Sequence, residues 1–221
     1  MSLFKKILLL ILLTVIVQKN VLATEMSSGV ISLQSKNFEH IEFSRIKPNH
    51  HFFHNQQLQI NVNKSASFLM QAFDQVKSVK RVSFEWHSNG FPKIKNAQSE
   101  EQKSGDDAVF KLGLLLKTDE SIFNPFIPEW MKHVESLLSF PSEEMIYLVA
   151  NAKHAIGEQW ANPYNKRVTM TSIESIESKQ NWKLARYEFD VSVNVVAIWL
   201  MADGDNTHSR FTTHIKNITI E

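Results

Sequence analysis

The chain has 221 residues, of which 43% are hydrophobic and 21% charged, and it contains no cysteine. This is the composition of a globular protein, and the missing thiols exclude a disulfide scaffold, an iron–sulfur cluster, a thiolate zinc site and a cysteine nucleophile. Its 24 basic and 23 acidic residues nearly balance, and no run of Lys and Arg alternates with aromatic residues, so nucleic acid is not an expected partner.

Residues 1–23 predict a secretory signal peptide. Lys5 and Lys6 precede an uninterrupted apolar run over 7–17, and the small-residue pattern of a cleavage site ends at Ala23. The run is shorter than the roughly 20 residues that a membrane-spanning helix needs, so we expect cleavage and no stable membrane insertion afterwards. Cleavage removes three lysines and no acid, which leaves 21 of the 24 basic residues against 23 acidic ones. The sequence thus predicts an exported protein, periplasmic or secreted.

Residues 24–221 show the pattern of an antiparallel β protein with a single domain. Short segments either alternate apolar and polar residues or are continuously apolar, and polar turns separate them. No linker or internal repeat divides the chain. Regular short strands favour a sandwich or barrel over βαβ units. The predicted strands cover 38–43, 57–63, 66–72, 79–87, 108–117, 145–152, 166–174, 183–190, 194–202 and 211–220.

Two segments interrupt the strand pattern. Residues 88–107 are polar and without periodicity, which predicts a long surface loop. Residues 128–140 carry apolar side chains at helical spacing between Pro128 and Pro141, which predicts one helix packed on the strands.

Acidic clusters stand at the ends of two predicted strands. One cluster precedes the strand 108–117 and the other follows the strand 194–202. Oxygen-rich clusters suit a hard cation such as Ca²⁺ or a polar ligand, but Asp and Gly at strand ends also form ordinary turns. If the two strand ends meet, the carboxylates converge. The polar residues of the two clusters are Asp106, Asp107, Asp203, Asp205 and Asn206.

Glu85 supplies an enzymatic alternative. It lies on the polar face of the predicted strand 79–87, and with one of the aspartates it could form the acid and base pair of a glycan hydrolase. No nucleophile elbow, zinc-protease motif or phosphate-binding loop occurs in the chain. Catalytic residues are therefore not assigned, and enzymatic activity is not favoured.

Aromatic side chains raise the question of a sugar-binding platform. Trp160 and Tyr164 lie in a turn-rich run together with Asn162, where flat rings could stack against a sugar. The alternative is that they cap one end of the sandwich. The other tryptophans considered are expected in the core: Trp86, Trp130 and Trp199.

Two further groups of residues are candidates for a binding or metal site. Lys111 and Gly113 share one face of the strand 108–117, and they could form the floor of a concave surface or plain exterior. His50, His51 and His54 would align as metal ligands on a helix, but their polar surroundings after Pro48 predict exposed loop histidines.

Several segments together form a recognisable pattern. In chain order they are an aromatic strand at 84–86, G-D-D-A at 105–108, Tyr147, W-A-N-P-Y at 160–164 and D-G-D-N-T at 203–207. Over roughly residues 38–221 this pattern resembles the exported bacterial proteins of domain-of-unknown-function family 3047. Two positions depart from it. Lys111 stands in place of an arginine and so lacks the bidentate fork of that side chain, and Val149 stands in place of a tryptophan.

The resemblance implies a jelly-roll-like β-sandwich similar to carbohydrate-binding modules, and it implies no established activity. We therefore predict an exported, non-enzymatic binding module for a saccharide or another polar envelope ligand. No cofactor is expected, and Ca²⁺ at the acidic clusters is the alternative. The alternatives are a glycan hydrolase using Glu85 with Asp106/Asp107 or Asp203/Asp205, and a structural or assembly protein of the cell envelope. The predicted ligand-binding residues are Glu85, Asp106, Asp107, Lys111, Trp160, Asn162, Tyr164, Asp203, Asp205 and Asn206.

Overall fold

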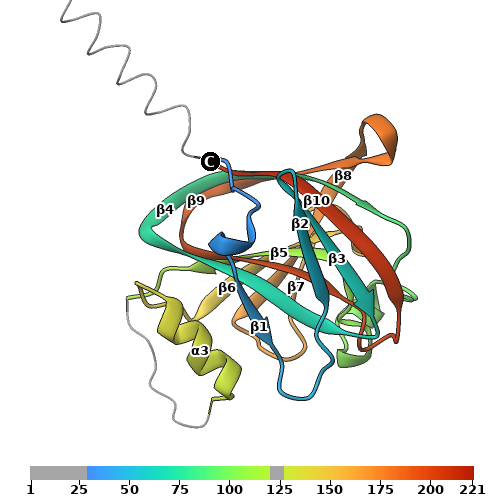
Figure 1. Cartoon of the computed structure of the whole chain (residues 1–221), viewed down its shortest axis with the longest axis horizontal. Coiled ribbons are helices and arrows are strands. Elements are labelled where there is room, and N and C mark those ends of the chain that lie inside the picture. Colours follow the sequence, from blue (N-terminus) through green and yellow to red (C-terminus); the bar gives the residue numbers. More distant parts are fainter. Residues whose placement is uncertain (1–28, 120–126) are drawn as a thin grey trace, which may run out of the picture.

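The computed structural model describes residues 29–119 and 127–221 (Figure 1). The predicted signal peptide, residues 1–23, lies outside the described residues. The strands are β1 (Glu39–Glu42), β2 (His50–His54), β3 (Gln57–Asn63), β4 (Ala66–Ser88), β5 (Ala108–Leu116), β6 (Glu144–Ala150), β7 (Gln159–Ala161), β8 (Val168–Glu177), β9 (Lys183–Asp203) and β10 (Arg210–Ile220). The helical segments are η1 (Ser35–Asn37), α2 (Ala97–Glu100), η2 (Lys103–Gly105), α3 (Glu129–Leu137) and η3 (Lys179–Asn181).

The strands of the described residues form one sheet in the order β2-β3-β10-β4-β9-β5-β6-β8-β7, with β1 paired to β4 and β8 also paired to β9. Every pairing is antiparallel except that of β6 with β8. The predicted fold class, a mostly antiparallel β-sandwich with a helix packed on it, is confirmed.

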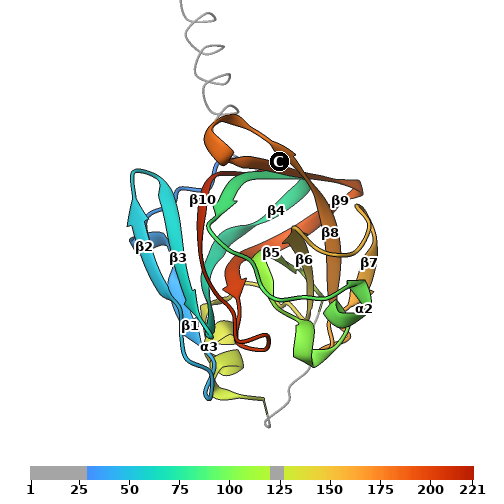
Figure 2. The ribbon, with the colours of Figure 1, turned by 90° about the vertical axis from the view of Figure 1, so that its right-hand side faces the viewer.

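Two long strands make the sheet turn on itself. The segments 66–72 and 79–87, predicted as separate strands, are both part of β4, and 183–190 and 194–202 are both part of β9. Polar residues between the apolar runs suggested breaks, but the β4–β9 pairing continues across them with two shifts of register. Extra residues of this kind bend a strand without ending it. The two strands therefore belong to both halves of the sheet, as Figure 2 shows.

Two short strands, β2 and β7, were not predicted from the sequence. The histidines predicted in a loop stand in β2, which pairs with β3 across a tight turn at Asn55 and Gln56, both with positive φ. The second is β7, which pairs with β8 and carries Trp160. Both strands are too short for a clear alternation of polar and apolar residues.

The bent sheet creates two apolar layers. The larger core lies between its halves and includes Phe84, Trp86, Phe110 and Ile198. A second core covers the outer face of β9, β5 and the first part of β4, where Phe68, Trp199 and Met201 are buried. Consequently β5 is buried on both faces over 108–115.

Helix α3 packs on this second core, beside β1 and β6 (Figure 1). Pro128 precedes its first turn, as the sequence predicted, and Val134 is its buried residue. Trp130 and Leu137 pack on the core from the same helix. Among the described residues, no helix has the length and apolar character required to cross a membrane.

Candidate ligand-binding cavity

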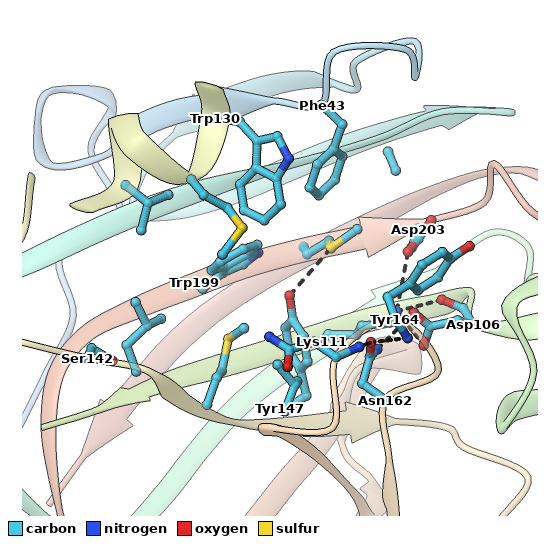
Figure 3. A pocket seen from close by; sticks show the side chains of 18 of the residues that line it. Phe43, Asp106, Lys111, Trp130, Ser142, Tyr147, Asn162, Tyr164, Trp199 and Asp203 are labelled. Atoms are coloured by element: carbon cyan, nitrogen blue, oxygen red, sulfur yellow. Dashed lines mark hydrogen bonds and ion pairs between the residues drawn. The ribbon is translucent and has the colours of Figure 1, made fainter. Parts of the chain in front are cut away.

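A cavity of about 460 Å³ lies in the second core, between α3, the chain that follows β1, and the outer faces of β5, β6 and β9 (Figure 3). Most of its wall is apolar, with Ile46, Leu115, Val134 and Met145 among the lining side chains. One group of polar and charged side chains lies at the end where Lys111 is found, and Ser142 lies on the opposite side (Figure 3). The other polar lining residues outside the Lys111 group are Glu135, Glu143 and Glu144. The cavity thus has an apolar body and a charged end.

Aromatic rings fix the shape of the apolar wall. Trp199 stacks on Phe68 with ring centroids 3.4 Å apart, and Trp130 meets Trp199 edge-on at 6.1 Å. Phe43 in turn lies edge-on to Trp130 at 5.2 Å. Tyr147 approaches Trp199 from β6 at 6.0 Å. Because each of these rings packs against another ring, the aromatic wall is formed by contacts within the protein and needs no ligand to order it.

Lys111 organises the charged end. Its strand is buried on both faces, and the side chain is only 2% exposed. The ammonium group donates to the backbone oxygen of Asp106 at 2.6 Å, to Asp106 Oδ1 at 3.2 Å and to Asp203 Oδ2 at 3.3 Å. These three bonds use all of its donors, so Lys111 positions the aspartates rather than offering a hydrogen bond to a ligand.

Burial shifts the pKa values of this network. Burial raises the pKa of Asp106, although Lys111 opposes the rise. The pKa of Asp203 is raised well above its ordinary value, first by burial and then by the carboxylates of Asp107 and Asp205. Burial disfavours the charge of Lys111, yet the carboxylates of Asp106 and Asp203 raise its pKa. A lone buried charge is costly, so the lysine and the aspartates depend on each other.

The two acidic clusters meet, as the sequence predicted they could. Ala108 at the start of β5 pairs with Asp203 at the end of β9. Asp107 accepts hydrogen bonds from the backbone N–H groups of Asn206 at 3.2 Å and Thr207 at 2.6 Å. The turn after β9 is therefore tied to the strand opening that precedes β5.

The turn after β7 joins the same network. Asn162 donates to Asp106 Oδ2 at 3.0 Å, and its own oxygen accepts from the backbone N–H of Tyr164 at 2.9 Å. The Tyr164 hydroxyl donates to Asn206 Oδ1 at 3.0 Å, and its ring is 57% exposed. Figure 3 shows Asn162, Tyr164, Asp106 and Asp203 together at this end of the cavity. Three segments that are distant in sequence thus build the charged end.

Trp160 does not form an exposed platform, and the prediction that it does is wrong. It is 8% exposed, and its ring stacks on that of His154 with centroids 4.0 Å apart. It is not among the residues that line the cavity. Because β7 pairs with β8, the side chain opposite Met170 is turned inward, and Trp160 covers the second core, the capping role that the sequence left as the alternative.

Glu85 lies far along the sheet from the acidic clusters. It accepts a hydrogen bond from Asn217 at 2.7 Å and pairs with Lys216 at 3.4 Å. In the β4–β9 register Glu85 is opposite Leu184, whereas Asp203 is opposite Ala66. Glu85 also lies on the face of β4 opposite the buried Phe84 and Trp86. The structure therefore does not bring it together with Asp106/Asp107 or Asp203/Asp205 as an acid and base pair.

Four aromatic residues of the cavity were not predicted as site residues. The sequence placed Trp130 and Trp199 in the core, which they do join, but no pattern showed that space remains between them. Phe43 and Tyr147 carried no site signal of their own. The sequence signal that could have located the cavity is Lys111, a charged residue within a strand whose other residues are apolar.

Comparison with known proteins adds three findings. Curated proteins give no significant match. A low-affinity xylan-binding module, CBM86 of the gut symbiont Roseburia intestinalis, aligns over 83% of this chain and 94% of its own, with 10% identity and a TM-score of 0.29, a value that does not establish a shared fold. The family described as protein of unknown function (DUF3047) matches residues 36–219, which include all the residues lining the cavity, and the chain therefore belongs to that family.

Proposed function

We propose that this chain is a binding module for a small amphiphilic ligand, with an apolar body in the cavity and a hydroxylated head at the charged end. Alkyl and aryl glycosides belong to this class. The observation that carries the proposal is the cavity itself, a space of about 460 Å³ with an aromatic wall and a buried charged network at one end. Cavities of roughly 300–1,000 Å³ with few polar groups are typical of small-molecule sites.

The apolar wall supports the choice of ligand body. A fully polar ligand would lose its hydration against Phe43, Trp130 and Leu115 without gaining hydrogen bonds. An alkyl chain or aromatic ring would gain about 25 cal/mol for each Å² removed from water. The wall therefore favours a ligand with an apolar part over a free sugar.

Unsatisfied polar groups support the choice of head. Within the described residues, the buried Oδ1 of Asp203 and the indole N–H of Trp199 have no hydrogen-bond partner. Buried groups of this kind are normally paired. Tyr164 and Asn206 add a hydroxyl and an amide to the lining. A head with several hydroxyl groups can donate to the carboxylate and accept from the other groups.

Calorimetric titration of the mature chain tests the proposal with three compounds: n-octyl glucoside below its micelle concentration, glucose, and octanoate. We expect octyl glucoside to bind more tightly than either part alone. Trp130→Ala, which removes one aromatic wall, should weaken this binding about tenfold or more, as expected for loss of a stacked aromatic contact.

Trp182→Ala is the matched control, because Trp182 lies edge-on to His87 and does not line the cavity. This variant should bind like the wild type. Equal binding of glucose and octyl glucoside would contradict the apolar body. Failure of all three compounds to bind would instead favour the structural or assembly role predicted as an alternative.

A further inference from the structure

We propose that Asp107, Asp203 and Asp205 hold a divalent cation, with Ca²⁺ preferred, beside the charged end of the cavity. One carboxylate oxygen from each residue lies within 4.8 Å of the others. The β5–β9 register explains this arrangement, because the start of β5 and the end of β9 are paired there. The ion would take Asp203 Oδ1 in place of a ligand head, whose other partners are the indole N–H of Trp199 and the Tyr164 hydroxyl, so the two proposals are tested separately.

A buried oxygen without a partner points to a missing ligand. Asp203 is 3% exposed, and its Oδ2 accepts from Lys111. Its other oxygen, Oδ1, is buried and receives no hydrogen bond from an N–H or hydroxyl group of the described residues, and the carboxyl group lies against that of Asp205. Leaving a charged oxygen unsatisfied in a protein interior is costly. A cation bound between the three carboxylates would satisfy it.

The local charge balance points the same way. Three buried carboxyl groups, those of Asp106, Asp107 and Asp203, lie around one buried lysine in the described part of the chain. Asp205 adds a fourth carboxylate that is only half-buried. Lys111 can balance one of these negative charges. A dication would balance two more without any rearrangement of the strands.

The ligand chemistry selects the type of ion. The cluster offers oxygen atoms and contains neither His nor Cys, a set that favours Ca²⁺ or Mg²⁺ over Zn²⁺ or Cu²⁺. Its groups come from two strand ends and a turn, and Ca²⁺ tolerates irregular coordination better than Mg²⁺ does. These two considerations lead to Ca²⁺.

Asn206 provides a fourth oxygen. Its Nδ2 lies 3.3 Å from Asp107 Oδ1 and 3.3 Å from Asp205 Oδ1, while its Oδ1 faces the Tyr164 hydroxyl. The two ends of an amide are interchangeable by a 180° rotation. Rotation would direct the oxygen to the cation and the NH₂ group to Tyr164, whose hydroxyl accepts as readily as it donates.

Calcium titration of the mature chain, stripped with EDTA and free of other ligands, tests the site. We expect one Ca²⁺ per chain with a dissociation constant on the order of 10⁻⁴–10⁻³ M or tighter, the range of extracellular modules. Bound Ca²⁺ should raise the melting temperature, and Mg²⁺ at the same concentration should raise it less. Terbium luminescence sensitised by the nearby Tyr164 should appear and be displaced by Ca²⁺.

Asp205→Asn is the informative variant, because Asp205 is half-buried and makes no ion pair with Lys111, so the fold should survive. It should weaken Ca²⁺ binding at least tenfold. Asp74→Asn makes the same charge change at an exposed position of β4 and should bind like the wild type.

Two results would overturn the proposal. One is the absence of saturable Ca²⁺ and Tb³⁺ binding to folded wild-type chain at about ten times the weakest expected dissociation constant. The other is equal Ca²⁺ affinity in the wild type and Asp205→Asn. Either result would leave a proton shared between Asp203 and Asp205 as the account of the cluster. Neither result bears on octyl glucoside binding, which is measured separately.

Discussion

The residues at the charged end have two kinds of role: some position the site, and others have polar groups that a ligand or ion can contact. Lys111, Asn162 and Asp107 make all or most of their hydrogen bonds inside the protein, so they position the site. Asp203 and Trp199 keep groups without partners among the described residues and remain available to a ligand or ion. Removing one member of a buried ion pair costs about 3–5 kcal/mol, so loss of binding in a Lys111 variant would have to be separated from loss of folding.

Trp160→Ala should lower the free energy of unfolding by about 3–5 kcal/mol, because it empties a buried site stacked on His154. Tyr164→Ala should change it by less than about 1 kcal/mol, since the ring is mostly exposed. Denaturant midpoints measured by fluorescence and circular dichroism check both values. If Trp160→Ala unfolded at the same denaturant midpoint as the wild type, the buried, capping role of Trp160 would be contradicted and the exposed platform predicted from the sequence would be supported.

His51 should make stability depend on pH. Burial, followed by the neighbouring His40 and His50, lowers its pKa from 6.5 to about 3. Below about pH 6.5 the His51 side chain is protonated in the unfolded chain but stays neutral in the folded chain. The free energy of unfolding is therefore highest above pH 6.5 and decreases as the pH falls from 6.5 to about 3. At pH 5 the loss should reach up to about 2 kcal/mol.

Urea unfolding of the wild type at pH 7 and pH 5 measures this loss. His51→Gln cannot titrate and should show a smaller difference between the two pH values. His54→Gln, at the exposed end of β2, should keep the wild-type difference. An unchanged difference in His51→Gln would rule out His51 as its source.

At the scale of elements, β5 forms the part of the cavity wall that lies opposite helix α3. Gly113 pairs with Tyr147 on one side and with Trp199 on the other. A side chain here would collide with Met145, Tyr147 and Trp199, which line the cavity. Helix α3 closes the opposite side with Trp130 and Val134. The cavity therefore lies between β5, which contributes Lys111 and Leu115, and a helix that does not fill the gap.

Gly113→Ala should destabilise the protein by about 1–3 kcal/mol, the usual cost of overpacking a core. The added Cβ would lie 2.8 Å from Met145 Sδ and 3.0 Å from Trp199 Cβ. The methionine can move, but the Trp199 Cβ is fixed to its strand. A shift of the thermal or denaturant midpoint measures the effect, and a stable variant with an unchanged midpoint would show that β5 and β9 can separate locally.

The whole molecule owes its two cores to β4 and β9, which pass through both halves of the sheet (Figure 2). The larger core is enclosed by the sheet itself. The second core is covered on its outer side by α3, β1 and Trp160. Because separate segments cover this second core, space remains beneath them, and the cavity of about 460 Å³ lies there. The charged end lies where the three sequence motifs meet.

Export stays a prediction, because residues 1–23 lie outside the described part of the chain. The full chain expressed in a bacterium should yield a periplasmic or secreted product that begins at Thr24, since the apolar run is too short to anchor it. Intact-mass measurement of the fractions checks this. A product that retains Met1 in the membrane fraction would contradict it.

The sequence by itself determined most of the strands, the helix at 128–140 and the family, because periodicity and turn residues are local signals. It also placed the acidic clusters at two strand ends that could meet and proposed Asn162 and Tyr164, from a turn, for the same ligand site. The structure joins these side chains in one hydrogen-bond network, and their role in binding stays a prediction. It could not show that 66–72 and 79–87 are one bent strand, nor that Trp160 is turned inward by the three-residue β7. These facts depend on pairing partners distant in the chain.

Only the tertiary structure decided the separation of Glu85 from the aspartates and the space between Trp130 and Trp199. Side chains that face a core look the same in a sequence whether they touch or leave a gap. A cavity forms where packed elements leave space between them. Its size depends on the distance between elements that are far apart in the chain, and a local sequence pattern does not contain that distance.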